Sequence, residues 1–457
     1  MRARTRLFSD SSYPASRMDM VEMIGRLPLD ALARSRVPDD LETVRRRADE
    51  ATPRQARSSR RAIEEVWRCA EALYRSGTQP GLQLCVRRRG EVALHRSLGH
   101  ARGNAPRQPA GERAVVMTPS TPVNAFSASK SVTAMLVHKL EEDGRLRLDD
   151  AVQDHIPAFG RRGKEAITIR QILTHRAGIP DLPDGGLDLD LLAQPERLLD
   201  LLCDLEPRSA PGAKPAYHAI SGGFVLGEVI QRVTGGSVRD LAARTVREPL
   251  GLEWFHYGVD TADLERVARN ASTGPLPPPP ISWLLKRTLG TDLRELIQLS
   301  NDPRFLTAVV PSANLFTTAG DIARFYQCLL DGGELEGVRV FEEETVERAL
   351  AAHGPPACDG NLILPMRYSP GFMLGSDTLS LYGWNHPRAF GHLGFSNVIC
   401  WADPDRDLVV ALLTTGKPVF SAHVVRLAQL IASIHDAFPP IGPRRTRKRA
   451  RGASDSP

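Results

Sequence analysis

Two stretches at opposite ends of the chain carry the pattern of a strand hairpin. "GLQLCVRRRGEVALHRSLG" (81–99) places apolar runs on either side of Gly90, and "SNVICWADPDRDLVVALLTTG" (396–416) places them around "DPDRD". Apolar, β-branched runs that flank such turn residues are typical of paired strands. We expect both hairpins to join one antiparallel sheet. The chain would then leave the sheet, form another region and return.

Helical patterns flank and separate these hairpins. "AIEEVWRCAEALYRSG" (62–77) and "HVVRLAQLIASIHDAF" (423–438) place apolar residues at helical spacing, and the residues between the hairpins are rich in helical patterns. The sequence therefore predicts an α/β (α+β) fold, in which helices flank an antiparallel sheet made from N- and C-terminal segments. A helical region is inserted between those segments.

We divide the chain into three parts. Residues 1–60 are polar and Arg-rich, which predicts a partly helical or disordered arm outside the main core. Residues 61–440 form the main domain, and 441–457 form a basic, disordered tail. Within the domain, 274–300 combines a proline run, which cannot be helical, with an amphipathic segment. That segment is either an ordinary core helix or a lid over an apolar cleft.

Composition narrows the function classes. The chain has 457 residues, 42% of them hydrophobic, and a formal charge of +5 that lies in its tail. We find no apolar run long enough for a transmembrane helix, no secretory signal and no basic face that predicts nucleic-acid binding. The six cysteines are scattered, so we expect reduced thiols and no metal site. These features favour a cytoplasmic location.

Ser127 and Lys130 are the first candidate functional pair. They lie three residues apart in "NAFSASKSVTAMLVHKL" (124–140), at the start of an expected helix, where both side chains share one face. A neutral lysine can take the proton of a serine hydroxyl, which arginine cannot do. The chain contains only seven lysines among its 59 basic residues, so a lysine at this position is notable. The alternative is a capping serine beside a surface lysine.

Two further segments supply groups that such a pair would need. Tyr217 lies in a short loop before a helix, where a nearby ammonium group would lower the pKa of its phenol and let it move protons; Lys214 is a rival cation. "FGHLGFSNVICW" reads as an edge strand that opens with Gly391, His392, Leu393 and Gly394. The N–H of Phe395 could complete an oxyanion hole, with His392 as a cation or hydrogen-bonding group in the cleft.

Taken in this order, the segments resemble a known family. "FSASKSVTA" is similar to the serine–lysine motif of class C β-lactamases, "PGAKPAYHA" to their Y-x-N loop and "GHLG" to an H-x-G version of their lysine–threonine–glycine strand. The likeness covers about residues 62–436. It is strongest to the β-lactamase-fold carboxylesterases called family VIII esterases, and it implies a β-lactamase/transpeptidase-like fold.

The resemblance also implies residue roles. Ser127 would be the acylated nucleophile, Lys130 its base partner, and Tyr217 the group that activates Ser127 and protonates the leaving alcohol. The N–H groups of Ser127 and Phe395 would bind the oxyanion, and His392 would replace the strand lysine. Such enzymes need no metal or cofactor.

Two departures from the β-lactamase pattern favour neutral esters as substrates. Ala219 stands where the Y-x-N motif has Asn, and Ala cannot contact the amide of a β-lactam. His392 holds a substrate carboxylate less well than Lys at neutral pH. We therefore expect a serine esterase for small-molecule esters with short to medium acyl chains.

Other readings stay open. They are a β-lactamase, a D-amino-acid peptidase or an acyltransferase on the same fold, and an inactive binding scaffold. A Ser-His-Asp triad through His175 or His218 is a further alternative, although no G-x-S-x-G motif occurs. The sequence does not specify the oligomeric state.

Overall fold

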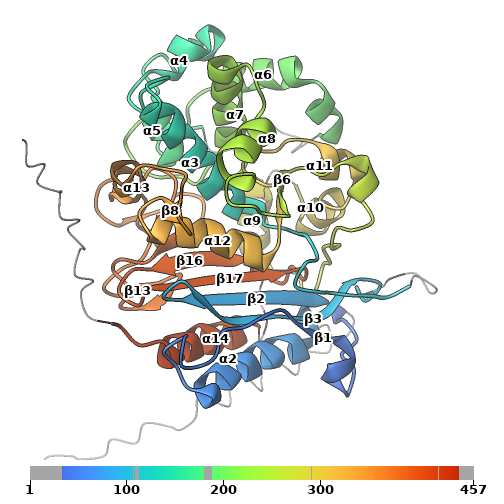
Figure 1. The fold of residues 1–457 in the computed structure, drawn as a ribbon. Coiled ribbons are helices and arrows are strands. Elements are labelled where there is room, and N and C mark those ends of the chain that lie inside the picture. The colour runs from blue at the N-terminus through green and yellow to red at the C-terminus, as the bar shows by residue number, and fades with distance from the viewer. Residues whose placement is uncertain are drawn as a thin grey trace, which may run out of the picture.

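An eight-stranded antiparallel sheet, built from both ends of the chain, forms the frame of the molecule (Figure 1). The computed structural model describes residues 33–106, 108, 113–179, 188–289, 291–419, 421 and 423–441. The strands run in the order β1 (Arg45–Arg47), β3 (Glu91–Arg102), β2 (Gly81–Arg88), β17 (Leu408–Thr414), β16 (Ile399–Asp403), β15 (Phe390–Leu393) and β12 (Met373–Leu374), and β4 (Val115–Val116) pairs with β3. The predicted fold class is confirmed.

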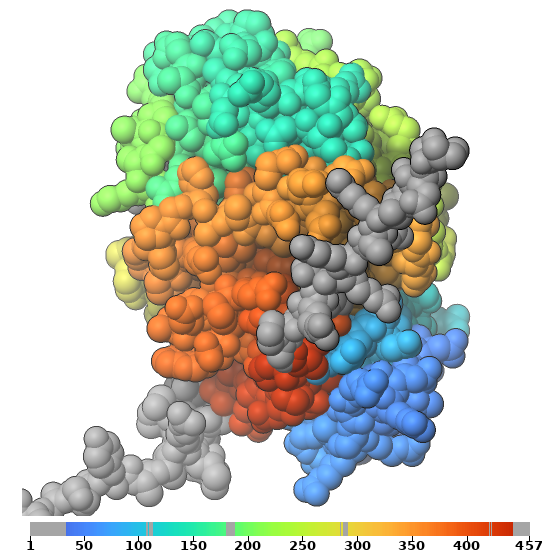
Figure 2. All heavy atoms as spheres, turned by 60° about the vertical axis from the view of Figure 1, so that its left-hand side comes forward, coloured from blue at the N-terminus to red at the C-terminus, as the bar shows by residue number. Residues whose placement is uncertain are grey.

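The two predicted hairpins form the centre of this sheet. Arg89 and Gly90, between β2 and β3, both have positive φ angles (57° and 85°), as a tight two-residue hairpin turn requires. The hairpins meet where β17 pairs with β2, for example Leu412 with Leu84. This register brings chain segments from opposite ends of the sequence together. They lie side by side at the base of the molecule in Figure 2, in red and blue.

The central strand β17 is buried on both faces. Leu408, Val410 and Leu412 join the core under α2 (Arg60–Leu73) and α14 (His423–Ala437). The alternate residues join the core on the other face, where α12 (Ala319–Leu330) crosses the sheet: Val409, Ala411 and Leu413. This alternation follows from the two-residue period of a strand. It fixes two layers of helices around one sheet (Figure 1).

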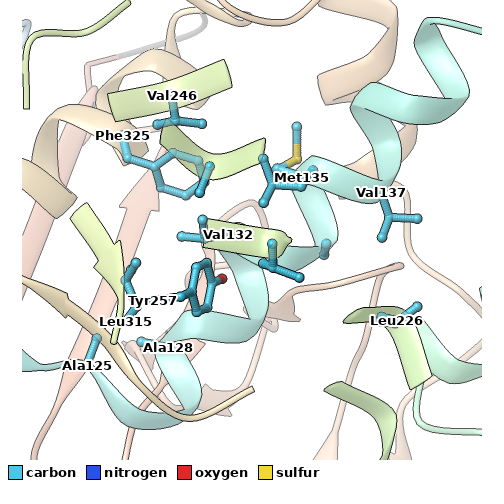
Figure 3. Close-up of a cluster of buried hydrophobic side chains, with 14 of the residues drawn as sticks. Ala125, Ala128, Val132, Met135, Val137, Leu226, Val246, Tyr257, Leu315 and Phe325 are labelled. Atoms are coloured by element: carbon cyan, nitrogen blue, oxygen red, sulfur yellow. The ribbon is translucent and has the colours of Figure 1, made fainter. Parts of the chain in front are cut away.

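The helical region above α12 is centred on α3 (Ser129–Glu142). Apolar side chains of α3, including Val132 and Met135, are fully buried among residues of neighbouring segments such as Val246, Tyr257 and Phe325 (Figure 3). Because most of α3 is buried, its first turn is held in a fixed position. The helices α7 (Ser221–Thr234), α8 (Val238–Ala242) and α13 (Glu343–Leu350) contact α3. The same region also contains α4 (Val152–His155), α5 (Ile169–Leu173), α6 (Pro195–Asp204) and α11 (Pro303–Thr307).

Short strands complete the architecture. A small sheet of β5 (Val123–Asn124), β7 (Leu315–Thr317) and β6 (Phe255–Tyr257) supports the start of α3. Three two-stranded hairpins are β8 (Glu334–Leu335) with β9 (Val338–Arg339), β10 (Ala357–Cys358) with β11 (Pro365–Met366), and β13 (Leu379–Ser380) with β14 (Gly383–Trp384). Within the described residues, no helix is both long and apolar enough to span a bilayer.

The described part of the expected N-terminal arm lies on the sheet rather than outside the core. A short 3-10 helix, Leu41–Val44, leads into β1, which pairs with β3. Leu41, Val44 and Ala56 are buried in the core beneath α2. The place of this segment on the sheet could not be predicted from the sequence, because β1 consists of three arginines. They form a strand only through their pairing with β3. Residues 1–32 and 442–457 lie outside the described residues.

The segment 274–300 divides into two helices with different surroundings. In α9 (Ile281–Leu289), Trp283 is 69% exposed, whereas in α10 (Leu293–Leu299) both Leu293 and Ile297 are buried. The two buried side chains of α10 support its interpretation as a core helix, whereas the exposed Trp283 of α9 does not. A lid formed by α9 stays a prediction.

Candidate active site

Ser127 lies on a 3-10 turn, Phe126–Ala128, that leads directly into α3. Phe126, the residue before it, has a positive φ of 48°, which is strained for an aromatic residue. The Asn124 side chain accepts a hydrogen bond from the Phe126 N–H at 2.8 Å, and the Ser129 hydroxyl donates to the Phe126 carbonyl. The turn is therefore fixed from both sides, and Ser127 is presented at a sharp bend.

Lys130 contacts Ser127 and two backbone carbonyls. Its Nζ lies 3.1 Å from the Ser127 Oγ, 2.8 Å from the Ala219 carbonyl oxygen and 3.0 Å from the Ser312 carbonyl oxygen. A neutral amine has two N–H donors and one lone pair. When the two carbonyls accept the two N–H groups, the lone pair faces the Ser127 hydroxyl. The geometry therefore suits proton transfer from serine to lysine.

The surroundings of Lys130 also favour its neutral form. Burial lowers the pKa of the Lys130 amine well below its ordinary value of 10.5, because an ammonium group loses its hydration there. No carboxylate forms an ion pair with this amine among the described residues. Lys130 is thus not a surface cation beside a capping serine, which was the alternative interpretation of the motif.

Tyr217 faces the same pair from the loop before α7. Its ring centroid lies 4.9 Å from the Lys130 Nζ. Burial raises the pKa of Tyr217, and the nearby Ser127 hydroxyl only partly opposes this effect. The expected lowering of this pKa is therefore wrong: desolvation outweighs any effect of Lys130. The rival cation, Lys214, is exposed.

Strand β15 brings His392 to the other side of the site. The β12 partner covers only Phe390 and Gly391, so His392 and Leu393 lie beyond the end of β12. The strand is thus an edge only over its second half, which differs from the expected edge strand. His392 is buried, its Nδ1 lies 2.7 Å from the Leu393 carbonyl oxygen, and burial lowers its pKa to about 3. It is a neutral group and not a cation.

The glycines of this strand have a structural reason. A side chain at Gly391 would place its Cβ 2.1 Å from the Cys400 carbonyl oxygen on β16. At Gly394 the Cβ would lie 2.5 Å from the Ala125 carbonyl oxygen, two residues before Ser127. Gly394 therefore lets the end of β15 approach the Ser127 turn. The ring centroids of Phe126 and Phe395 lie 5.5 Å apart, so Phe395 also lies beside the Ser127 turn.

His175 and His218 are near the site but form no catalytic triad. The His175 ring lies 4.6 Å from the Tyr217 ring, and its Nδ1 accepts the backbone N–H of His218 at 3.2 Å. Burial is the main cause that lowers the pKa of both imidazoles. Within the described part of the chain, neither ring bonds to Ser127 or to a carboxylate.

A small cavity adjoins these groups. It offers about 30 Å³ to the centres of water molecules, which is room for roughly two waters. Its polar lining comes from Lys130, Thr133, His175, His218, Ser312 and His392, and apolar residues of α5 and α7 with Pro311 complete it.

Several residues that shape the site carry no motif. Asp359 and Asn361 bind the backbone of Tyr217 from positions 142 and 144 residues away. The buried Lys417 places its Nζ 4.6 Å from the centroid of the Phe126 ring. No local pattern in the sequence could have identified these contacts, because they exist only once distant segments pack together.

The sheet, the inserted helical region and the serine, lysine and tyrosine between them define a class of protein: the serine hydrolases of the β-lactamase/transpeptidase-like fold. The Beta-lactamase family model matches residues 61–433, and the chain belongs to this family.

The chain is similar to proteins whose names refer to an esterase, a β-lactamase or a penicillin-binding protein. The chain is 29% identical over 330 residues to Esterase/beta-lactamase LipL of Mycobacterium tuberculosis, covering 68% of this chain and 71% of that protein. Among solved structures, a penicillin-binding protein homologue from Caulobacter crescentus superposes with a TM-score of 0.70 at 25% identity, over 82% of this chain and 98% of that one. A family VIII carboxylesterase has a TM-score of 0.69 at 26% identity, over 81% and 97%.

Proposed function

We propose that the protein is a serine carboxylesterase that hydrolyses neutral esters through an acyl-enzyme on Ser127. The observation that carries this proposal is the hydrogen bond between Lys130 and Ser127, with both N–H groups of a neutral amine directed at carbonyls. The names of LipL and of the family VIII carboxylesterase agree with esterase activity.

In the first half of the reaction, Lys130 takes the hydroxyl proton and Ser127 Oγ attacks the ester carbonyl carbon. The N–H groups of Ser127 and Phe395 hold the negative charge that forms on the carbonyl oxygen. The C–O bond to the alcohol then breaks, and the departing oxygen receives the Tyr217 phenol proton. Tyr217 regains a proton from the Lys130 ammonium.

In the second half, water attacks the acyl carbonyl of the ester formed on Ser127. Lys130, again a neutral amine, accepts a proton of this water. The bond between the acyl carbon and Ser127 Oγ then breaks, the Lys130 ammonium returns the proton to Oγ, and the carboxylic acid leaves. No metal or cofactor takes part in this scheme.

The same site supports neutral substrates over anionic ones. A β-lactam or a peptide with a free terminus carries a carboxylate, and such a group needs a cation to bind it. Here His392 is neutral, and Ala219 offers only its backbone, whose carbonyl already accepts from Lys130. We therefore place β-lactamase and D-amino-acid peptidase activity second.

The decisive experiment compares initial rates of p-nitrophenyl butyrate hydrolysis by the wild type and Ser127→Ala. We expect the variant to lose at least about 10³-fold in kcat, because it lacks the nucleophile. Ser120→Ala, which changes an exposed serine, is the matched control and should retain the wild-type rate. Equal activity of Ser127→Ala and wild type would refute the proposal. A chromogenic cephalosporin hydrolysed faster than the ester would instead favour lactamase chemistry.

A further inference from the structure

A buried carboxylate lies next to the Tyr217 loop. Asp359 is fully buried in the turn that joins β10 to β11, and it forms no ion pair among the described residues. A charge in such a place is costly unless hydrogen bonds replace its hydration. The structure supplies four donors. The Oδ1 atom accepts the backbone N–H groups of Tyr217 (3.1 Å), Asn361 (2.8 Å) and Leu362 (2.9 Å), and Oδ2 accepts the Tyr368 hydroxyl (2.9 Å).

The same turn binds the Tyr217 loop at two more points. The Asn361 side-chain amide donates to the Tyr217 carbonyl oxygen at 3.0 Å, and the Gly360 N–H donates to the Pro215 carbonyl oxygen at 2.9 Å. Both backbone polar groups of Tyr217 are thus held by one hairpin. The loop before α7 has no strand or helix of its own to fix this residue. His175 accepts the N–H groups of Ala216 and His218 on either side, and the hairpin holds Tyr217 itself.

The side chains around the phenol reinforce this arrangement. Tyr368, which donates to Asp359, makes an edge contact with the His175 ring at 5.1 Å between centroids. The His175 ring also lies 4.6 Å from the Tyr217 ring. Asp359 therefore touches both the backbone of Tyr217 and the group of rings that surrounds it, without contacting Ser127 or Lys130.

We propose that Asp359 is a positioning residue, whose carboxylate anchors the backbone of Tyr217 so that the phenol reaches the departing alcohol oxygen. This inference rests on the proposed esterase function and assigns a role to a residue outside the motifs. The role is mechanical: the oxygen atoms of Asp359 matter as hydrogen-bond acceptors. A misplacement of a catalytic group by about 1 Å can cost roughly 10²-fold in rate.

The leaving group of the substrate separates this role from a general loss of structure. p-Nitrophenolate departs readily without a proton, whereas ethoxide needs one. Asp359→Ala should therefore lower kcat/KM for ethyl butyrate by about 10- to 100-fold and for p-nitrophenyl butyrate by less than about 3-fold. Tyr217→Phe should show the same selectivity. Adding Asp359→Ala to Tyr217→Phe should cost little more, because both changes remove one function.

Asp359→Asn is the conservative rescue. Its Oδ1 still accepts the three N–H groups, and its amide donates to the Tyr368 oxygen, which turns from donor to acceptor. We expect this variant to keep the ratio of the two substrates within about 3-fold of wild type. If Asn is as impaired as Ala, the anchoring role is refuted.

Asn361→Ala provides a second test should Asp359→Ala fail to fold. It removes the hydrogen bond to the Tyr217 carbonyl and should produce the same leaving-group selectivity, with a smaller loss of kcat/KM for ethyl butyrate. An equal loss on both esters, with Ser127-dependent hydrolysis intact in the wild type, would refute this inference and leave the esterase proposal standing. Activity that persists in Ser127→Ala would instead refute the esterase proposal.

Discussion

The amine of Lys130 lies 3.1 Å from the hydroxyl oxygen of Ser127, three residues earlier in the chain. The carbonyls that direct this amine belong to Ala219 and Ser312, 89 and 182 residues away. The pair is thus local in sequence, but its orientation is set by two distant segments. This relationship makes the role of Lys130 directly testable.

Lys130→Arg should lose at least about 10³-fold in kcat for p-nitrophenyl butyrate. Arginine stays protonated at accessible pH, so it cannot accept a proton from serine. The measurement is the steady-state rate, with the melting temperature as a check on folding. Lys139→Arg is the control on the same helix: Lys139 is partly exposed and forms an ion pair with Glu142, so this variant should keep the wild-type rate. More than about a tenth of wild-type activity in Lys130→Arg would contradict the base role.

The pH profile of the wild type should show an amine that loses its proton well below the pH usual for lysine. Burial lowers the pKa of Lys130 well below 10.5, and only the deprotonated amine can act as base. We expect kcat/KM to rise from acidic pH and reach its plateau well before pH 10. Initial rates between pH 5 and 10, in buffers of constant ionic strength, measure this. A rate that still increases tenfold per pH unit near pH 9 would indicate an ordinary lysine.

Lys417 should make stability depend on pH. Its amine is fully buried, donates to the Thr414 carbonyl at 2.7 Å, and burial lowers its pKa from 10.5 to about 7. Between pH 7 and 10.5 the unfolded chain therefore binds more protons at this site than the folded one. Stability contributed by Lys417 must then increase as the pH rises through this window.

Lys417→Met removes this contribution. Urea unfolding at pH 7 and pH 9.5 should show that the wild type gains on the order of 1–3 kcal/mol more than the variant. Lys286→Met is the control, since that lysine is exposed and should leave the pH dependence unchanged. If wild type and Lys417→Met gain the same free energy of unfolding, Lys417 is not titrating as inferred.

Trp283 and Ile297 should respond differently to truncation. Ile297→Ala removes a buried side chain of α10 and should cost roughly 2–4 kcal/mol of stability. Trp283→Ala removes an exposed ring of α9 and should shift the melting temperature by less than about 2 °C. If α9 is a lid, Trp283→Ala should change the ratio of rates on p-nitrophenyl octanoate and butyrate. An unchanged ratio would argue against the lid.

Much of the sheet was predictable because its signals are local. The turns at Gly90 and at "DPDRD", and the apolar runs around them, lie within short windows, so hairpins could be located from spacing alone. The strand β1 could not, because three arginines become a strand only through pairing with β3. The described part of the arm packs on the core because β1 pairs with the edge of the sheet, and its composition does not indicate this.

The site shows the same division. Ser127 and Lys130 are neighbours on one turn and could be paired from the sequence. The pKa of Tyr217 was predicted in the wrong direction, because a loop residue in the sequence gives no sign of its burial. Asp359 was missed altogether, since its partners are brought near only by the packing of the β10–β11 hairpin.

The sequence by itself determined the kind of fold, the serine–lysine pair and the order of the segments that accompany it. These properties depend on residue type and on spacings of a few positions. The tertiary structure alone decided which groups are charged and where they point: the neutral Lys130 and His392, the protonated Tyr217 and the anchoring Asp359. The physical reason is that desolvation and long-range hydrogen bonds depend on which distant segments surround a side chain, and that exists only in the folded molecule.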